Sequence, residues 1–219
     1  EVYNFREERK LLEDRGHRFK TNTDTEVVLH AYLEYGDEFV HHLRGMFALA
    51  LFDWRDASID GPPTVSLVRG PMGIKPLYVA EVGDDRKTLV FSSEIRSLLA
   101  SGFVERRVSG EAFRDFLQYG FVLQPRSIIR GVRMVMPGTI ERYQPGRSPT
   151  VHRYWKLPDY TPRKETFGEA AERLRSELEE SVRLHSLADA PVGSFLSGGI
   201  DSTCITALMR EHVADLRTY

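Results

Sequence analysis

Residues 196–202 read Leu-Ser-Gly-Gly-Ile-Asp-Ser, and this stretch decides the fold of the C-terminal part of the chain. It lies between an apolar segment of strand length, Pro191–Leu196, and a helical pattern that runs from Ser202 to Val213. Two adjacent glycines let backbone N–H groups approach a phosphate closely, and a helix N-terminus favours an anion. We expect a phosphate-binding loop here. The alternative is an ordinary Gly-Gly turn in which Asp201 or Ser202 caps the helix.

The side chains of this loop favour the phosphate interpretation. Ser197 and Ser202 carry hydroxyl groups that can donate to phosphate oxygens. Asp201 would repel a bare phosphate, so its presence predicts a Mg²⁺ ion that binds carboxylate and phosphate oxygens together. The sequence has no Gly-x-x-x-x-Gly-Lys-Ser/Thr motif, which excludes the common P-loop of kinases and GTPases.

The chain changes character ahead of this loop. Residues 157–165 contain two prolines among polar residues, as is typical of a linker. A long amphipathic helix is predicted from Phe167, with an apolar stripe of Ala171, Leu174, Leu178 and Val182. Helix, strand and helix in this order predict the beginning of an α/β unit with a parallel sheet.

The part before the linker is predicted to be α+β, with strands outnumbering helices. Met46–Phe52 is a continuous apolar run, which we interpret as a strand buried on both faces. Further strands are predicted at Thr64–Arg69, Pro76–Val82, Thr88–Ser92, Gly138–Tyr143 and Val151–Trp155. Helices are predicted at Phe5–Arg15, at Val27–Tyr35 behind a Thr23-x-x-Glu26 capping box, at Glu94–Ser101, and from Ser109 to Tyr119.

Composition narrows the classes of protein. Among 219 residues, 30 basic and 32 acidic side chains give a net charge of -2, which argues against a nucleic-acid partner. The single cysteine, Cys204, excludes an internal disulfide and a cysteine-rich zinc site, and we expect it to be buried and structural. The longest apolar run, Met46–Phe52, is far too short to cross a membrane, and we expect no signal peptide. We expect a cytoplasmic protein with no membrane partner.

The glycine loop resembles the pyrophosphate-binding loop of the N-type ATP pyrophosphatases. Upstream stretches narrow the resemblance to the glutamine-hydrolysing asparagine synthetase family, and they follow one another in that family's order. These stretches are Glu1–Asn4, Thr23–Val27, Leu43–Ala48, Gly73–Tyr78, Phe91–Ile95, Arg153–Trp155 and Asp189–Gly193.

The resemblance implies two domains and one overall reaction. Residues 1–156 would form an N-terminal-nucleophile glutaminase, an αββα sandwich that lacks its N-terminal part here. Residues 157–165 would be the linker, and 166–219 the start of the ATP-pyrophosphatase domain. The implied activity is glutamine-dependent amidation of aspartate to asparagine through a β-aspartyl-adenylate, with ATP and Mg²⁺. Glutamine, aspartate and ATP are the implied substrates, and a homodimer is left open.

The resemblance also assigns roles to residues of this chain. Glu1 and Asp24 would hold the ammonium group of glutamine. The ATP-binding residues would be Leu196, Ser197, Gly198, Gly199, Asp201 and Ser202, with Asp201 as a ligand of Mg²⁺. The nucleophilic cysteine and the arginine that binds the glutamine carboxylate are expected upstream of Glu1. We therefore expect a fragment that contains no catalytic residue and is inactive by itself.

Other interpretations stay open at this point. Gly70 follows Arg69 where the family has aspartate, which we expect to loosen the loop behind it. This departure is compatible with a specialised amidotransferase. A β-lactam-synthetase-like relative and an ATP-binding scaffold without catalysis are further alternatives. Glu1 has a disordered terminus as its alternative, and Asp24 also suits a helix N-terminus by its charge alone.

Overall fold

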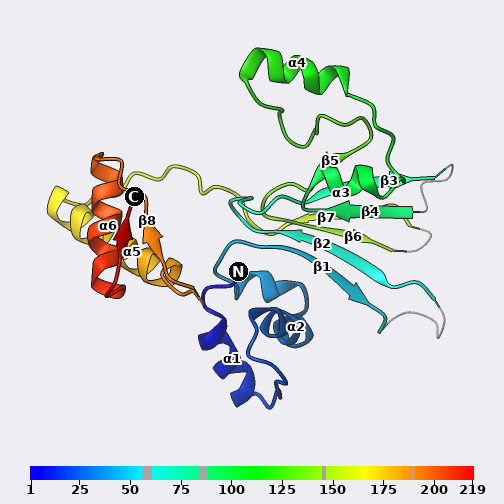
Figure 1. Ribbon diagram of the computed structural model, residues 1–219. Helices are drawn as coiled ribbons and strands as arrows, with labels where there is room; N and C mark the ends of the chain where they lie inside the picture. Colours follow the sequence, from blue (N-terminus) through cyan, green and yellow to red (C-terminus); the bar gives the residue numbers. More distant parts are fainter. Residues whose placement is uncertain (56–60, 84–87, 145–146, 189) are drawn as a thin grey trace. The chain divides into compact units, whose positions relative to one another are not determined.

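The computed structural model describes residues 1–55, 61–83, 88–144, 147–188 and 190–219, and the chain divides into two compact units (Figure 1). The first unit combines Glu1–Val2 with Arg44–Leu157, and the second combines Tyr3–Leu43 with Pro158–Tyr219. Asp189, part of the family resemblance, lies outside the described residues.

The first unit contains two antiparallel sheets. The four-stranded sheet has the order β1 (Ala48–Asp53), β2 (Thr64–Arg69), β6 (Thr139–Tyr143) and β7 (Thr150–Arg153). The three-stranded sheet has the order β4 (Thr88–Ser92), β3 (Tyr78–Val82) and β5 (Arg133–Met134). Within the first sheet the register aligns Ala50 with Leu67, Leu67 with Glu141, and Glu141 with Val151.

Side chains of β3 point alternately to the two faces of its sheet, and each face belongs to a separate hydrophobic core. Val79 is buried with Leu67 of β2, so one face of β3 packs against the four-stranded sheet. Ala80 points to the opposite face, as the period of two in a strand requires. There it is buried with Leu98 of helix α3 (Ile95–Ala100). The layers of this unit are therefore sheet, sheet and helix.

Helix α4 (Gly110–Tyr119) has the predicted bounds. The Ser109 hydroxyl accepts a hydrogen bond from the Ala112 N–H at 3.3 Å, which caps the N-terminus. Gly120 ends the helix in the left-handed conformation, with φ of +79°.

The prediction for β1 is wrong in its burial. We expected Met46–Phe52 to be covered on both faces, but β1 is an edge strand and the Phe52 side chain is 49% exposed. A continuous apolar run gives no information about the position of a strand within its sheet, and this position decides how much of the strand is covered.

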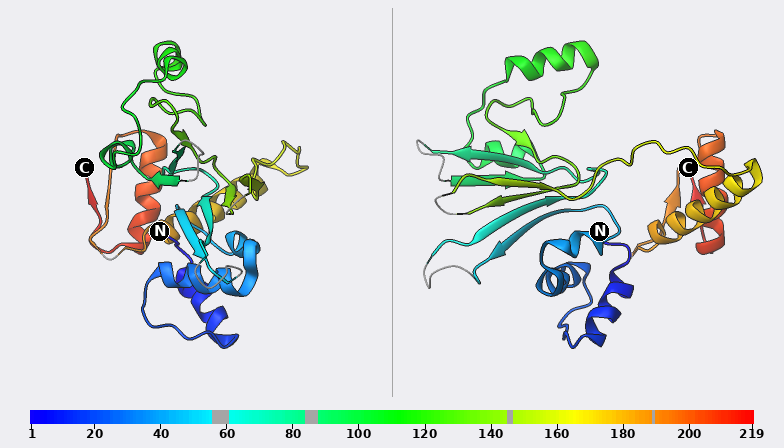
Figure 2. Two further views of the ribbon diagram at one scale, coloured as in Figure 1. Left: turned by 90° about the vertical axis from the view of Figure 1, so that its right-hand side faces the viewer. Right: turned by 180° about the vertical axis from the view of Figure 1, so that it is seen from behind.

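The second unit contains the remaining helices. Its elements are α1 (Phe5–Asp14), α2 (Asp24–Tyr35), the 3₁₀ helix η1 (Gly36–His41), α5 (Phe167–His185), β8 (Gly193–Ser194), α6 (Ile200–His212) and β9 (Arg217–Thr218). Strands β8 and β9 pair in parallel with α6 between them, which is a βαβ unit. Figure 2 shows α5 and α6 side by side.

The C-terminal helices are less buried than the sequence predicts. Of the predicted stripe on α5 only Val182 is buried, and Leu174 is 58% exposed. Cys204 is exposed, contrary to our expectation, because α6 has no buried residue. Among the described residues, no helix has both the length and the apolar composition needed to cross a membrane. The predicted class, an antiparallel two-sheet α+β fold followed by helix–strand–helix, is confirmed.

Arg69 is the largest fully buried side chain, with 2% of its surface exposed. Its guanidinium donates to two acceptors in the loop that follows β2, the carbonyls of Gly73 at 2.7 Å and Lys75 at 3.0 Å. It also donates to two distant acceptors, the Val135 carbonyl at 2.7 Å and Gln124 Oε1 at 3.0 Å. Burial lowers the pKa of Arg69. The charge is therefore stabilised by backbone and amide dipoles of three chain segments.

An ion pair between a half-buried arginine and a buried glutamate also joins the two sheets. Arg133 of β5 donates to both carboxylate oxygens of Glu141 on β6, each at 2.7 Å. The Tyr143 hydroxyl donates to the same carboxylate at 2.8 Å. The hydrogen bonds to Glu141 raise the pKa of Arg133, and burial raises the pKa of Tyr143.

Replacing Arg69 with methionine should destabilise the chain severely. Methionine fills a similar volume but donates no hydrogen bond, so it leaves four acceptors without their donor. We expect the free energy of unfolding, measured by chemical denaturation, to fall by about 3 kcal/mol or more. The exposed Arg153 of β7 is the matched control, and Arg153→Met should change it by less than about 0.5 kcal/mol. Equal losses in the two variants would refute a structural role for the buried guanidinium.

Candidate functional site

The glycine loop forms the turn between β8 and α6, where the sequence predicts it. Gly198 has φ of +83°, and a Cβ atom built on it would meet no other atom within 4 Å. Gly199 is the N-cap of α6, so neither Asp201 nor Ser202 is the N-cap residue. No side chain caps this helix, which leaves its first N–H groups available to an anion.

The loop brings Ser197 and Ser202 together. Their hydroxyl oxygens are 3.0 Å apart, and Ser202 Oγ donates to the Gly199 carbonyl at 3.1 Å. Ser197 therefore donates to Ser202, and both hydroxyl protons are engaged within the loop. The first backbone N–H groups of α6, which no side chain caps, are therefore the available donors, and the two hydroxyls must rotate before they can donate to a phosphate.

The loop suits an anion better than a metal ion held by protein ligands alone. Leu196, Ser197, Gly198, Gly199 and Asp201 are exposed, and Ser202 is half-buried. Among the described residues no cluster of three or more His, Cys, Asp or Glu side chains could hold a metal ion. Asp201 is the one carboxylate of the loop, so a cation there would need phosphate oxygens as further ligands.

Glu1 is held by its backbone. Its nitrogen donates to the Met46 carbonyl at 2.9 Å, and its carbonyl accepts from the Met46 N–H at 3.0 Å. Gly45 permits this pairing, because a Cβ atom on residue 45 would lie 2.2 Å from the Glu1 carbonyl oxygen. The backbone pairing contradicts the alternative of a disordered Glu1.

Asp24 is the first residue of α2 and is half-buried. Its carboxylate accepts a hydrogen bond from the Thr25 hydroxyl at 3.4 Å. The charge also suits the positive end of the helix, as the sequence predicts. Glu1 belongs to the first unit and Asp24 to the second. The structure therefore describes the surroundings of each residue only within its own unit.

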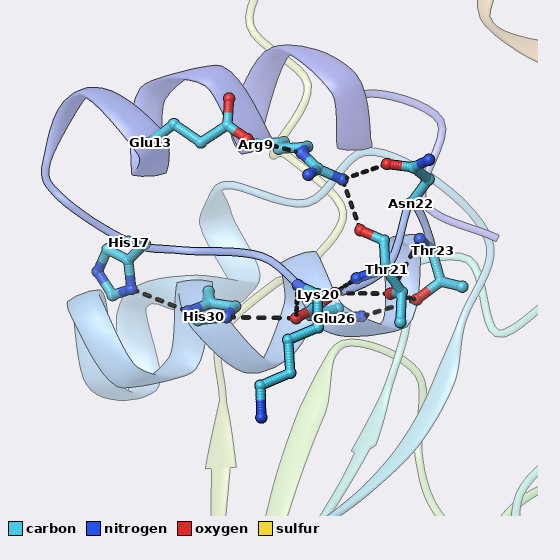
Figure 3. A network of polar contacts seen from close by, with 9 residues as sticks. All are labelled: Arg9, Glu13, His17, Lys20, Thr21, Asn22, Thr23, Glu26 and His30. Atoms are coloured by element: carbon cyan, nitrogen blue, oxygen red, sulfur yellow. Dashed lines mark hydrogen bonds and ion pairs between the residues drawn. The ribbon is translucent and has the colours of Figure 1, made fainter.

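The segment that leads to Asp24 is tied to both neighbouring helices (Figure 3). The Glu26 carboxylate accepts from the N–H groups of Lys20 at 2.7 Å and Thr21 at 2.6 Å, and from the Thr21 hydroxyl at 2.6 Å. Arg9 of α1 donates to the Thr21 carbonyl at 2.7 Å and to Asn22 Oδ1 at 3.0 Å.

Glu26 corrects the prediction of a capping box. The Thr23 hydroxyl accepts from the Glu26 N–H at 3.4 Å as expected, but the Glu26 carboxylate bonds Lys20 and Thr21. The hydrogen bonds from Thr21 and from the Lys20 backbone lower the pKa of Glu26 from 4.5 to about 2. Neither these bonds nor the contacts of Arg9 could be read from a local pattern.

A histidine pair lies behind Glu26. The Nδ1 atoms of His17 and His30 are 2.9 Å apart, so one of them carries a proton and the other accepts it. His17 Nε2 is 2.8 Å from Glu34, and His30 Nε2 is 3.8 Å from Glu26. The pair links the loop to the far end of α2.

The loop behind Gly70 is not loose, contrary to our expectation. The Gly70 N–H donates to the Phe47 carbonyl at 2.9 Å, and the Gly70 carbonyl accepts from Gly73 at 3.0 Å. Arg69 binds the carbonyls of Gly73 and Lys75 in the same loop. Backbone and guanidinium bonds thus hold this loop without an aspartate at position 70.

The chain thus combines an antiparallel two-sheet fold with a strand, a glycine turn and a helix. The chain belongs to the family described as glutamine amidotransferase domain, whose model matches residues 1–155. Residues 173–219 match the family model described as asparagine synthase.

Curated relatives extend the match over the whole chain. Asparagine synthetase [glutamine-hydrolyzing] 1 of Bacillus subtilis is 35% identical over 100% of this chain and 33% of its own length. A putative asparagine synthetase of Mycobacterium bovis is 34% identical over 100% of this chain and 33% of its own length. The chain therefore spans about a third of the length of these relatives.

A solved structure is similar at a lower level. The glutamine phosphoribosylpyrophosphate amidotransferase of B. subtilis matches with a TM-score of 0.49 and 17% identity. The match covers 100% of this chain and 43% of that protein's chain.

The bonds of Glu26 predict a specific response to acid. Because its pKa in the folded chain is lowered to about 2, Glu26 stabilises the fold above pH 4.5, and this contribution is lost as the pH falls toward 2. Glu26→Gln should therefore flatten the dependence of the unfolding midpoint on pH between 4.5 and 2. Thermal unfolding followed by circular dichroism measures this midpoint.

A second variant tests the cause of the shift. Thr21→Val removes the hydroxyl that contributes most to it, so the pKa of Glu26 in the folded chain should rise toward 4.5. The acid-induced loss should then be smaller than in the wild type and complete at a higher pH. Thr21→Ser keeps the hydroxyl and should behave as the wild type does. Parallel pH curves for the wild type and Glu26→Gln would contradict the assignment.

Proposed function

We propose that the protein carrying this chain is a glutamine- and ATP-dependent ligase that amidates aspartate to asparagine. One observation carries the proposal: a glutamine amidotransferase match and an asparagine synthase match follow each other in a single chain. The named relatives, which hydrolyse glutamine according to their names, support the same reaction.

Glutamine binding is the proposed task of Glu1 and Asp24. A free amino acid presents an ammonium group, and a carboxylate can both neutralise this group and accept its hydrogen bonds. The backbone pairing of Glu1 with Met46 and the helical position of Asp24 give both carboxylates a fixed base. The nucleophile that attacks the glutamine amide would be a cysteine outside these residues.

ATP binding is the proposed task of the loop from Leu196 to Ser202. The N–H groups at the start of α6 would hold phosphate oxygens, and Ser197 and Ser202 would add hydroxyl donors after rotation. Mg²⁺ would arrive with the nucleotide and take Asp201 as a protein ligand. ATP supplies the adenylate that turns the aspartate β-carboxylate into an acyl group with a good leaving group, and ammonia then displaces AMP.

The proposed domains follow the two matches. Residues 1–156 would be the glutaminase domain, 157–165 the linker and 166–219 the start of the synthetase domain. The matched ranges, 1–155 and 173–219, lie on either side of the proposed linker. The proposed location of the protein is the cytoplasm.

A specialised amidotransferase is the second candidate. Gly70 replaces the aspartate of the family pattern. A relative named Amidase chry2, from Gibberella zeae, is 32% identical over 95% of this chain and 30% of its own length. Such an enzyme would use the same glutamine and ATP sites but another acceptor carboxylate, so the acceptor separates the two candidates.

Product analysis of the full-length protein tests the proposal. With glutamine, aspartate and Mg-ATP we expect asparagine, glutamate, AMP and pyrophosphate. Asp201→Asn should lower pyrophosphate release by about tenfold or more, because it removes a charge from the metal–phosphate contact. Glutamine hydrolysis should be retained.

The exposed Cys204 lies on the same helix and provides the control, since Cys204→Ala should leave both activities unchanged. Release of ADP and phosphate, or an unaltered Asp201→Asn variant, would contradict the ATP assignment. ATP cleavage that responds to another carboxylate and not to aspartate would favour the second candidate.

A further inference from the structure

We propose that Arg9 and Glu26 are positioning residues, which hold the segment from Lys20 to Thr23 so that Asp24 meets the ammonium group of glutamine. This inference rests on the proposed function of Asp24. According to this inference, Arg9 and Glu26 control the affinity for glutamine although neither side chain binds it.

Glu26 holds the segment from one side. Its Oε1 accepts from the Lys20 N–H, and its Oε2 accepts from both the N–H and the hydroxyl of Thr21. All three donors lie within 2.7 Å of the carboxylate, as is typical of charge-assisted hydrogen bonds. Glu26 itself is fixed, because it belongs to the first turn of α2.

Arg9 holds the same segment from the other side. Its Nη1 atom reaches the Thr21 carbonyl and the Asn22 side chain (Figure 3). Two further contacts fix the guanidinium: Nε donates to Glu13 at 2.9 Å, and the Arg9 Cζ atom lies 4.6 Å from the centre of the Phe19 ring. The N–H, hydroxyl and carbonyl groups of Thr21 are thus all bound by charged side chains.

The hydroxyl protons complete a closed ring of bonds beside Asp24. Thr21 Oγ1 donates to Glu26, so it accepts from the Thr23 hydroxyl at 2.9 Å. Thr23 Oγ1 in turn accepts from the Glu26 N–H. Asp24 lies between Thr23 and Glu26 in the chain, so both of its flanks belong to this ring.

The consequence for binding is geometric. A carboxylate recognises an ammonium group only at hydrogen-bond distance, and a displacement of about 1 Å weakens such a contact strongly. Loss of Glu26 or Arg9 would release the backbone at Thr21 and let the start of α2 relax. The affinity for glutamine would fall, while the chemical step would continue once glutamine is bound.

Steady-state glutamine hydrolysis by the full-length protein tests the inference. We expect Glu26→Gln, Arg9→Met and Thr21→Val each to raise KM for glutamine by about tenfold, with kcat changed less than about twofold. Thr21→Ser keeps the hydroxyl and should restore the wild-type KM. Arg15→Met is the matched control, because Arg15 pairs with Glu34 and lies over the Tyr35 ring at the other end of α2; its KM should not change.

Asp24→Asn, measured in parallel, distinguishes a failure of the positioning role from a failure of the proposed glutamine binding by Asp24. If Asp24→Asn raises KM while the Glu26, Arg9 and Thr21 variants do not, the positioning role is overturned and the proposed function stands. If Asp24→Asn leaves KM unchanged, Asp24 is not the ligand and both proposals fail for this site. A loss of thermal stability or kcat at constant KM would also overturn the positioning role, since it would reveal a structural contribution alone.

Discussion

The buried guanidinium of Arg69 is the interaction on which the first unit depends. It stands at the end of β2 and binds carbonyl groups of the loop behind it, of Val135 beside β5, and the side chain of Gln124. Its own carbonyl accepts from Gly138 and from the Tyr154 hydroxyl. One residue therefore connects the four-stranded sheet to the segments that carry the three-stranded sheet and β7.

Glu26 follows the same principle in the second unit with the opposite charge. A carboxylate there gathers backbone N–H groups, as Arg69 gathers carbonyl groups, and in both cases main-chain dipoles of a returning loop stabilise the charge. The two loops held in this way, Gly73–Tyr78 and Lys20–Thr23, adjoin or contain stretches that resemble the asparagine synthetases. Glu26 thus holds the segment beside the proposed glutamine ligand Asp24, and Arg69 orders the loop behind β2.

The fold was predictable where the pattern is local. Alternation gave β2 and β4 their observed bounds, and Ser109 and Gly120 delimited α4. Local patterns failed where another segment competes for the same side chain. Thr166 and Glu169 form a complete capping box. Glu26 stands at the same spacing from Thr23, but its carboxylate binds the backbone of Lys20 and Thr21 instead. The glycine loop was predictable from its residues, but the contacts of Arg9 across 12 or 13 positions were not.

Transfer of the amide nitrogen tests the central claim most directly. Glutamine labelled with ¹⁵N in its side-chain amide is supplied to the full-length protein with aspartate and Mg-ATP, and the products are followed by nuclear magnetic resonance. The account predicts that the label appears in the side-chain amide of asparagine. Label that stays in glutamine, or that accumulates as ammonium without labelled asparagine while ATP is present, would contradict it.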